Sequence, residues 1–201
     1  MKSDTVYIIQ KQLIKGNLDY VLSFIDEKRK EKALKLPTED GRLLSLGAAH
    51  LMKKHLPNKE INENEYGKPY IEGGPFFNIS HSGDYSVLAI HPSREVGVDI
   101  EKINETKINA IKYTLSEDEK KENNPETLFR MWSNKESIVK CISTGLNDIK
   151  KVNALPLNGP RKIGPKSYFT KSELYKGYSL SITLEGEEEF EIEIKEEIGL
   201  H

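Results

Sequence analysis

The sequence has one cysteine, Cys141, among its 201 residues. A single cysteine excludes an intramolecular disulfide and any cluster of thiolate ligands around a metal. No stretch approaches the roughly 18 consecutive apolar residues that a membrane-spanning helix needs. Residues 1–10 also lack the apolar core of a secretory signal peptide. We therefore expect a protein of the reducing cytoplasm that does not associate with membranes.

An excess of charge of either sign is absent as well. The 30 basic residues nearly balance the 32 acidic ones, so no global field favours nucleic acid, and we expect no nucleic-acid partner. A P-loop and a Gly-x-Ser-x-Gly elbow are both missing, which removes support for NTPases and hydrolases of those kinds. Any site for an anion must therefore be local.

The hydrophobic periodicity predicts a chain of the α+β class. A change from strand to helix patterning near Asn104 predicts two halves, residues 1–103 and 104–201. Residues 85–90 and 96–100 are predicted to pair as a hairpin, as are residues 178–184 and 190–194. The predicted helices are 18–36, 38–56 and 127–142, and the remaining predicted strands are 5–10 and 76–79.

Two carboxylates alternate along one predicted strand. Asp99 and Glu101 are two residues apart, so both point to the same face and can converge on one hard cation. An isolated Asp-x-Glu is more often a pair of solvated acids at a strand end. The assignment of a metal site therefore depends on the neighbouring segments.

The predicted helix 127–142 carries charged residues where an apolar stripe is expected. Lys135 falls near the centre of that stripe, and an unpaired buried ammonium is costly, so this lysine must extend to solvent or meet an anion. Glu136 and Lys140 are one turn apart and could simply form a surface pair. A functional interpretation accounts for all three residues: Glu136 would bind a metal ion, and Lys135 and Lys140 would bind phosphate groups.

Magnesium takes a few carboxylates together with substrate phosphate oxygens. Asp99, Glu101 and Glu136 could supply such a partial shell. Zinc is excluded by the lack of a His/Cys cluster with ligand spacing. The segment Ser80-His81-Ser82 lies in a predicted polar turn and offers hydroxyl and imidazole donors to an anion, or only caps its own turn.

Four segments, in this order, resemble the phosphopantetheinyl transferases of the surfactin-synthetase-activating type. The resemblance spans residues 66–146 and weakens toward the N-terminus and beyond residue 157. The segments are Tyr66-Gly67-Lys68-Pro69, Phe77-Asn78-Ile79-Ser80-His81-Ser82, Val96-Gly97-Val98-Asp99-Ile100-Glu101, and Trp132-Ser133-Asn134-Lys135-Glu136-Ser137 with Lys140 and Gly145-Leu146.

This resemblance implies two pseudo-symmetric α+β halves with coenzyme A bound between them. It also implies roles for single residues. The implied magnesium ligands (with manganese as an alternative ion) are Asp99, Glu101 and Glu136; the implied catalytic residues are Glu136, Lys140, Glu119 and His81; the implied coenzyme ligands are Lys28, Lys32, Arg42, Lys68, Pro69, Ser80, His81, Lys135 and Lys140.

The implied reaction transfers the 4′-phosphopantetheine arm of coenzyme A to a serine of an apo acyl or peptidyl carrier protein of a fatty acid or secondary-metabolite synthase. The enzyme is expected to be a monomer. Two alternatives remain open. A magnesium-dependent nucleotide hydrolase would use the same carboxylates without a protein substrate, and a non-catalytic module would bind coenzyme A or a carrier without turnover.

Overall fold

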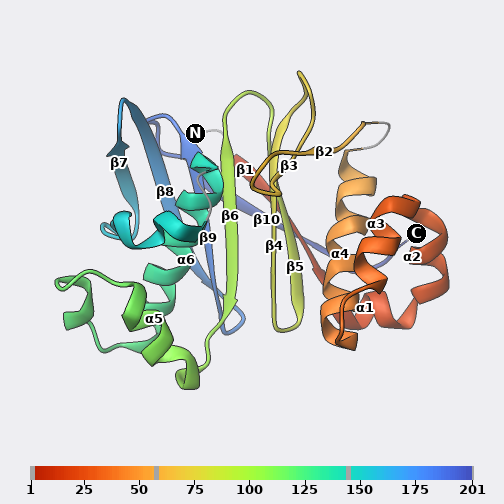
Figure 1. The fold of residues 1–201 in the computed structure, drawn as a ribbon, viewed down its shortest axis with the longest axis horizontal. Helices are drawn as coiled ribbons and strands as arrows, with labels where there is room; N and C mark the ends of the chain where they lie inside the picture. Colours follow the sequence, from red (N-terminus) through yellow and green to blue (C-terminus); the bar gives the residue numbers. More distant parts are fainter. Residues whose placement is uncertain (1–2, 57–58, 144–145, 201) are drawn as a thin grey trace.

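Two four-stranded sheets stand at the centre of the molecule, and helices cover its two outer flanks (Figure 1). The computed structural model describes residues 3–56, 59–143 and 146–200. Helices and strands are mixed along the chain, so the predicted α+β class is confirmed. Within the described residues, no helix is long and apolar enough to span a bilayer.

The first sheet has the strand order β10-β1-β5-β4, and the second has the order β6-β9-β8-β7. A separate two-stranded ribbon, β2-β3, lies outside both sheets. The strands are β1 (Ser3–Gln10), β2 (Asn62–Glu63), β3 (Pro69–Tyr70), β4 (Phe76–Ser82), β5 (Tyr85–His91), β6 (Val96–Lys102), β7 (Gly159–Ile163), β8 (Lys166–Tyr175), β9 (Tyr178–Glu185) and β10 (Glu191–Glu197).

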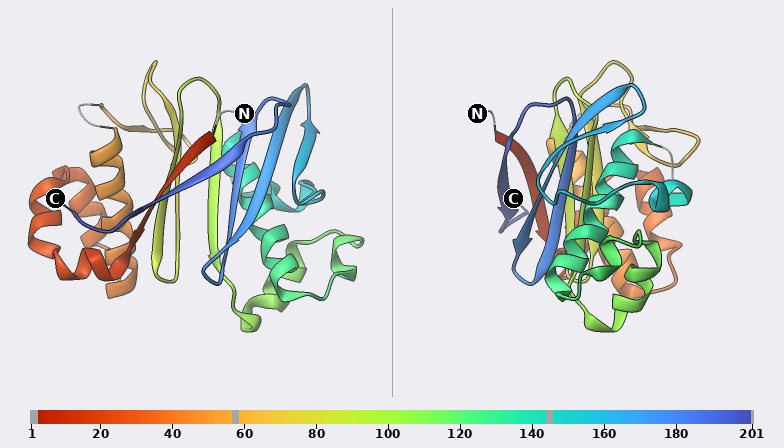
Figure 2. Two further views of the ribbon diagram at one scale, coloured as in Figure 1. Left: turned by 180° about the vertical axis from the view of Figure 1, so that it is seen from behind. Right: turned by 90° about the vertical axis from the view of Figure 1, so that its left-hand side faces the viewer.

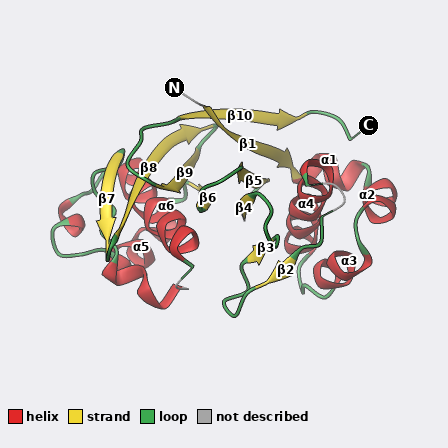
Figure 3. Cartoon of the chain, turned by 90° about the horizontal axis from the view of Figure 1, so that it is seen from above, coloured by secondary structure: helices red, strands yellow, loops and turns green. Residues whose placement is uncertain are grey.

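Helices α1 and α4 pack on the first sheet, α2 and α3 pack against α4, and α5 and α6 lie on the side of the second sheet (Figures 1 and 3). Thr38 caps α4 by accepting a hydrogen bond from the Gly41 amide, and Asn124 caps α6 in the same way for Thr127. The α-helices are α1 (Lys11–Gly16), α2 (Leu18–Phe24), α3 (Glu27–Leu34), α4 (Glu39–His55), α5 (Ile108–Thr114) and α6 (Pro125–Ile142), and 3-10 turns cover Glu105–Lys107, Glu119–Lys121 and Leu146–Lys151.

The hydrophobic core has one part that both sheets share. Val6 and Val87 of the first sheet are buried in the same cluster as Val98, Ile100 and Ile182 of the second. Burial of this apolar surface is the main favourable contribution to holding the halves together. A second cluster joins α1, α2 and α4 to the other face of the first sheet.

Between the two sheets, β4 and β6 are held together by side chains instead of a backbone ladder. Asn78 Oδ1 accepts a hydrogen bond from the Val98 amide at 3.0 Å. Farther along, Ser82 Oγ accepts one from the Lys102 amide at 3.1 Å. Since alternate residues of a strand share a face, one face of β4 satisfies alternate amides of β6. This seam fixes β6 and its carboxylates against β4.

Each sheet contains a strand from the other half of the sequence. Although β6 precedes Asn104, it belongs to the second sheet, paired with β9. The last strand, β10, returns to the first sheet and pairs in parallel with β1 (Figure 2). Leu200, beyond β10, is buried in the core of the first half. The first and last strands of the chain are thus neighbours in the first sheet.

Both predicted hairpins are wrong in their pairing. The strand β5 pairs with β1 and β4, not with β6. The strand β9 pairs with β6 and β8, and β10 pairs with β1; β7 and β8 are not among the predicted strands. Period-2 patterns identify strands but do not specify their partners, which are set by packing between distant segments.

Two further predictions are corrected by the local structure. The single helix predicted for residues 18–36 is divided into α2 and α3, because Ile25 and Asp26 adopt extended backbone conformations. The residues Ser80, His81 and Ser82 are part of β4 itself, and the turn follows at Gly83 and Asp84. Their alternation along a strand sends His81 to the opposite face from the two serines.

Candidate active site

Asp99 of β6 is the most deeply buried carboxylate of the candidate site, at 1% exposure. Its Oδ1 atom accepts hydrogen bonds from Lys140 Nζ at 2.6 Å and from Ser80 Oγ at 2.8 Å. Its Oδ2 atom is buried and has no hydrogen-bond partner among the described residues. A buried carboxylate oxygen without a partner is costly, so this atom is available for a ligand.

Glu101, two residues along β6, is held by three groups. Oε2 accepts a hydrogen bond from Ser82 Oγ at 3.0 Å and lies 3.6 Å from Lys107 Nζ. Oε1 accepts one from the Trp132 indole nitrogen at 3.4 Å. Burial raises the pKa of Glu101, and the charge of Asp99 raises it further.

Glu136 and Lys140 enter the same cluster from α6. Lys140 Nζ lies 3.3 Å from Glu136 Oε2 and donates to Ser80 Oγ at 3.1 Å. Burial, followed by the charge of Asp99, raises the pKa of Glu136 to about 7. Burial alone would lower the pKa of Lys140, but the charges of Asp99 and Glu136 raise it on balance. The lysine is therefore a stable cation among three carboxylates.

The helix α6 can approach β6 this closely because position 97 is a glycine. A Cβ atom on Gly97 would overlap the carbonyl oxygen of Ser137 and the amide nitrogen of Cys141. Burial raises the pKa of the Cys141 thiol to about 12, so this cysteine does not provide a nucleophilic thiolate near neutral pH. Its place in the site is structural.

The carboxylate cluster suits a hard divalent cation. Asp99, Glu101 and Glu136 offer only oxygen donors, which magnesium prefers, and the charge of Asp99 raises the pKa of both glutamates. Across residues 3–56, 59–143 and 146–200, no three His, Cys, Asp or Glu side chains are already arranged to hold a metal ion. The fit therefore rests on the chemistry of these donors and on the unpaired Oδ2 of Asp99.

Lys135 and Glu119 are brought together elsewhere, in the interior of the second half. Lys135 Nζ lies 2.9 Å from Glu119 Oε2 and donates to the Val152 carbonyl at 2.6 Å. Both side chains are at most 1% exposed. The anion that Lys135 meets is thus the carboxylate of Glu119, and neither residue faces the pockets beside the carboxylate cluster.

Glu119 binds more than this lysine. Its carboxylate accepts hydrogen bonds from the Ser116 amide at 2.7 Å and the Ala154 amide at 2.6 Å. Burial alone would raise the pKa of Glu119, but these two amides and Lys135 lower it on balance. A carboxylate saturated with donors in this way is suited to fixing loops, and it is unsuited to accepting a proton from a substrate.

A pocket of about 290 Å³ adjoins the carboxylate cluster. Glu136, Val139 and Lys140 of α6 form one wall, and Asn78 and Ile79 of β4 form another. The remaining lining residues are Tyr66, Gly67, Lys68, Pro69 and Ser143. Lys68 and Pro69 therefore line the pocket beside the cluster. Gly145, which belongs to the sequence motif of Glu136 and Lys140, lies outside the described residues.

A second pocket, of about 240 Å³, lies on the other side of Ile79 and has a cationic lining. It is lined by His81 of β4, Arg29 and Lys32 of α3, and Ser45 of α4. Arg29 Nη2 is buried without a hydrogen-bond partner among the described residues. The pKa of His81 is lowered, first by desolvation and then by the charge of Lys140. This pocket is suited to a phosphate group.

Of the three basic residues that the sequence proposed for such a role, only Lys32 reaches this pocket. Lys28 is exposed on α3 and does not line it. Arg42 donates from Nη1 to the Leu36 carbonyl at 2.9 Å, so it holds the segment between α3 and α4. Arg29, one residue beyond Lys28, occupies the lining instead, and Ser45 had not been proposed. Positions 28 and 29 point to different sides of α3. Because the chain leaves the helical conformation before α3, the pattern of one continuous helix over residues 18–36 does not show which of the two positions faces the pocket.

Comparison with known proteins gives a consistent family. The model of the 4'-phosphopantetheinyl transferase superfamily matches residues 95–192. A 4'-phosphopantetheinyl transferase of Bacillus subtilis is 30% identical over 73% of this chain and 72% of its own length. The 4'-phosphopantetheinyl transferase gsp of Aneurinibacillus migulanus is 39% identical, but the match covers 46% of this chain and 42% of that relative. The chain thus spans less than half of one relative and nearly three quarters of the other.

Proposed function

Because the chain belongs to the 4'-phosphopantetheinyl transferase family, we propose that it transfers the phosphopantetheine arm of coenzyme A to a serine of an apo carrier protein. The observation that carries this proposal is the cluster of Asp99, Glu101, Glu136 and Lys140, which adjoins one pocket, while a second pocket lined by Arg29 and Lys32 shares Ile79 with the first. A nucleotide with two separate phosphate groups matches that arrangement.

The charges of the pockets support one orientation of the coenzyme. The pocket of Arg29, Lys32 and His81 receives the 3′-phosphate, because charge-assisted hydrogen bonds from the arginine and the lysine are strong and the imidazole adds a neutral donor. The adenine lies in the neighbouring pocket, against the backbone at Lys68 and Pro69. The pyrophosphate then extends toward Lys140.

Asp99, Glu101 and Glu136 would hold a magnesium ion, and manganese has the same preference for oxygen ligands. When bound, the ion neutralises the charge of the pyrophosphate oxygens during transfer. Ser80 and Ser82 donate to two of these carboxylates and so fix their orientation. Such supporting hydrogen bonds are a common feature of metal sites.

The reaction proposed is a direct phosphoryl transfer. The serine hydroxyl oxygen of the carrier forms a bond to the β-phosphorus, while the bond from that phosphorus to the bridging oxygen breaks. The serine proton passes to a carboxylate of the cluster, and adenosine 3′,5′-bisphosphate leaves. Lys140 meets the charge that accumulates on the phosphate oxygens, whereas His81, which lines the pocket proposed for the 3′-phosphate, binds the coenzyme there and is not assigned the catalytic role that the family resemblance implied.

The acceptor is an acyl or peptidyl carrier protein of a fatty acid or secondary-metabolite synthase. We place the reaction in the cytoplasm and propose that the chain acts as a monomer. These assignments follow from the family and from the composition of the sequence.

The test is intact-protein mass spectrometry of an apo carrier incubated with the chain, coenzyme A and Mg²⁺. Glu136→Gln removes a cluster carboxylate, and Glu126→Gln is a matched control at an exposed position of the same helix. We expect the mass of one phosphopantetheine arm to be added by the native chain and by Glu126→Gln, and not by Glu136→Gln or in EDTA.

The other outcomes separate the alternatives. No mass change on either type of carrier, with the chain folded and coenzyme A hydrolysed, would favour the nucleotide hydrolase. Coenzyme binding without turnover and without dependence on magnesium would favour a binding module. Modification that persists in EDTA would keep the transferase and remove the metal assignment.

A further inference from the structure

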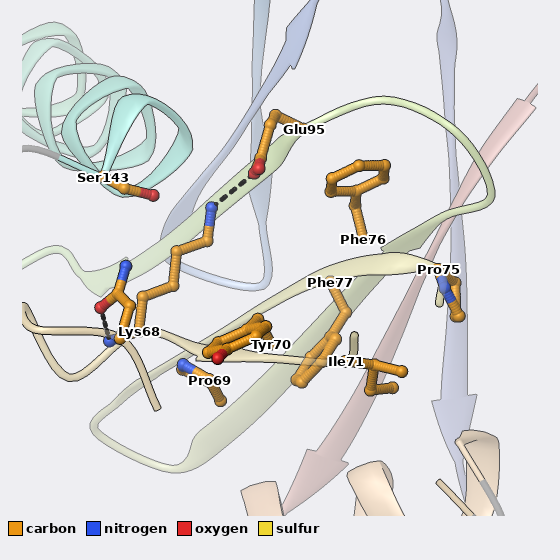
Figure 4. A pocket seen from close by; sticks show the side chains of 10 residues that line it. Lys68, Pro69, Tyr70, Ile71, Pro75, Phe76, Phe77, Glu95 and Ser143 are labelled. Carbon is orange, nitrogen blue, oxygen red and sulfur yellow. Dashed lines mark hydrogen bonds and ion pairs between the residues drawn. The ribbon is translucent and has the colours of Figure 1, made fainter. Parts of the chain in front are cut away.

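The ammonium group of Lys68 is bound to protein atoms beside the proposed coenzyme pocket. Lys68 Nζ donates to Glu95 Oε2 at 2.8 Å and approaches the Cys141 carbonyl oxygen at 3.4 Å. Figure 4 shows the lysine side chain extended toward Glu95. Its side chain is 12% exposed. The residue thus lines the pocket with its stem while its charge is directed to the start of β6 and the end of α6.

The segment that carries Lys68 is a short ribbon tied at both ends. At its tip, Asn64 Oδ1 accepts hydrogen bonds from the amides of Tyr66 at 3.0 Å and Lys68 at 2.9 Å. At one end, Glu63 pairs with Arg29 and Lys32 of α3. At the other end, Lys68 is held by Glu95. Figure 3 shows the β2-β3 ribbon between the helices of the two halves.

The backbone of Glu95, to which the ribbon is attached through Lys68, is held by two neighbouring elements. The Glu95 carbonyl accepts hydrogen bonds from the Glu185 amide at 3.0 Å and from the Cys141 thiol at 3.4 Å. Glu95 is therefore fixed to both β9 and α6 immediately before β6 begins. These contacts fix the backbone from which the Glu95 carboxylate extends, so the carboxylate can define the position of a lysine that is otherwise flexible.

We propose that Glu95 is a positioning residue for the coenzyme pocket and that it acts through Lys68. It holds the ribbon of residues 62–70 against the second half, so that the wall formed by Lys68 and Pro69 is in place before the nucleotide binds. This inference rests on the proposed function. Preorganisation of this kind lowers the cost of binding without taking part in the chemical step.

A direct contact between the Lys68 ammonium and the coenzyme would have the opposite consequence. Glu95 would then compete with the nucleotide for the lysine, and its removal would strengthen binding. The sign of the effect therefore distinguishes the two roles.

The experiment compares Glu95→Gln with Glu191→Gln, a control that breaks another Lys–Glu pair, that of Lys171 and Glu191 at 2.7 Å on β10. We expect Glu95→Gln to raise the KM for coenzyme A about two- to ten-fold with kcat changed less than two-fold. Lys68→Met should have a similar effect, and the double variant should be no worse than the more affected single variant. Glu191→Gln should leave both constants unchanged.

Amide hydrogen exchange of the apo chain gives a second measurement that does not need turnover. Exchange in residues 64–70 should be faster in Glu95→Gln than in the native chain and Glu191→Gln. An unchanged or lowered KM, additive effects in the double variant, or unchanged exchange would each overturn the positioning role. If the native chain modifies no carrier, the proposed function fails, and the exchange rates alone then decide whether Glu95 holds the ribbon.

Discussion

The ammonium nitrogen of Lys140 lies 2.6 Å from Oδ1 of Asp99 and joins the long helix α6 to the edge strand β6. Gly97 makes this approach possible, because a side chain there would overlap the α6 backbone. The lysine also contacts Glu136, one turn before it on the same helix. One ammonium group therefore lies between two carboxylates that would otherwise repel each other. Because the cluster has three carboxylates and one lysine, it could also bind a metal cation.

Glu136→Gln should separate activity from stability. The raised pKa of about 7 means that the folded state resists ionisation of Glu136, so stability falls as pH rises from about 4.5 to 7. At pH 8 the variant should be at least as stable as the native chain, while carrier modification slows by about 100-fold or more. Thermal unfolding and initial rates at pH 8 test this. Losses of stability and activity in parallel would contradict it.

Lys135→Met should destabilise the fold and affect the coenzyme little. The substitution leaves the Glu119 charge buried without its partner, which costs about 3–5 kcal/mol in comparable buried pairs. Adding Glu119→Gln removes that unpaired charge. The decrease in unfolding free energy of the double variant should therefore be smaller than the sum of the decreases for the two single variants. Urea unfolding measures these free energies. An unchanged stability with a raised KM for coenzyme A would instead place Lys135 at a phosphate.

The sequence was sufficient to predict the residues of the acidic cluster but not their surroundings. Alternation along β6 put Asp99 and Glu101 on one face, and helical spacing brought Glu136 and Lys140 together. The helical pattern also placed Lys135 in the apolar stripe correctly. It could not identify Glu119 as the partner, because that contact depends on the path of a loop that packs on α6.

Pairing between segments far apart in the sequence explains the remaining differences between the predicted and the observed fold. Residues of β10 have a clear strand pattern, yet they pair with β1 at the other end of the chain. The side chains of Asn78, Ser80 and Ser82 resemble a polar turn in isolation, because no local signal shows that β6 lies beside them. Such contacts are set by the whole core, which a pattern over a few residues does not describe.

His50 should make the fold sensitive to mild acid. Its ring packs against Phe24, with 5.1 Å between centroids, and its two nitrogens have no hydrogen-bond partner among the described residues. Burial, together with the charge of Lys54, lowers the pKa of His50 to about 4. Between pH 6.5 and 4 the unfolded chain binds a proton that the folded chain does not, so stability falls as pH decreases through this range.

His50→Leu removes this proton linkage. Between pH 7 and pH 5, the free energy of unfolding of the native chain should fall by about 2 kcal/mol relative to that of the variant, since one pKa unit corresponds to about 1.4 kcal/mol. Urea unfolding at the two pH values gives the comparison, and carboxylates that titrate in both proteins cancel. A difference between the two proteins that is the same at both pH values would mean that His50 takes up a proton as readily in the folded chain as in the unfolded one.

Glu63 should weaken the binding of the 3′-phosphate. Its Oε1 atom lies 2.8 Å from Lys32 Nζ and 3.2 Å from Arg29 Nη1, the cations proposed for that phosphate. The hydrogen bond from Lys32 lowers the pKa of Glu63, so its carboxylate is charged at neutral pH and repels a phosphate dianion bound to the same groups. Glu63→Gln should therefore tighten coenzyme A binding by about two- to ten-fold, an effect reduced by salt.

Dephospho-coenzyme A, which lacks the 3′-phosphate, is the matched ligand for this prediction. Its affinity should be the same for the native chain and Glu63→Gln, because the repulsion requires the missing group and because the Lys68–Glu95 contact, which the variant keeps, still holds the ribbon. Glu60→Gln, at an exposed position nearby, serves as the protein control and should bind both nucleotides as the native chain does. Titration calorimetry of the three proteins with each nucleotide measures the six affinities. Weaker coenzyme A binding in Glu63→Gln would mean that the carboxylate orients Arg29 and Lys32, and an equal gain for both nucleotides would move the 3′-phosphate out of this pocket.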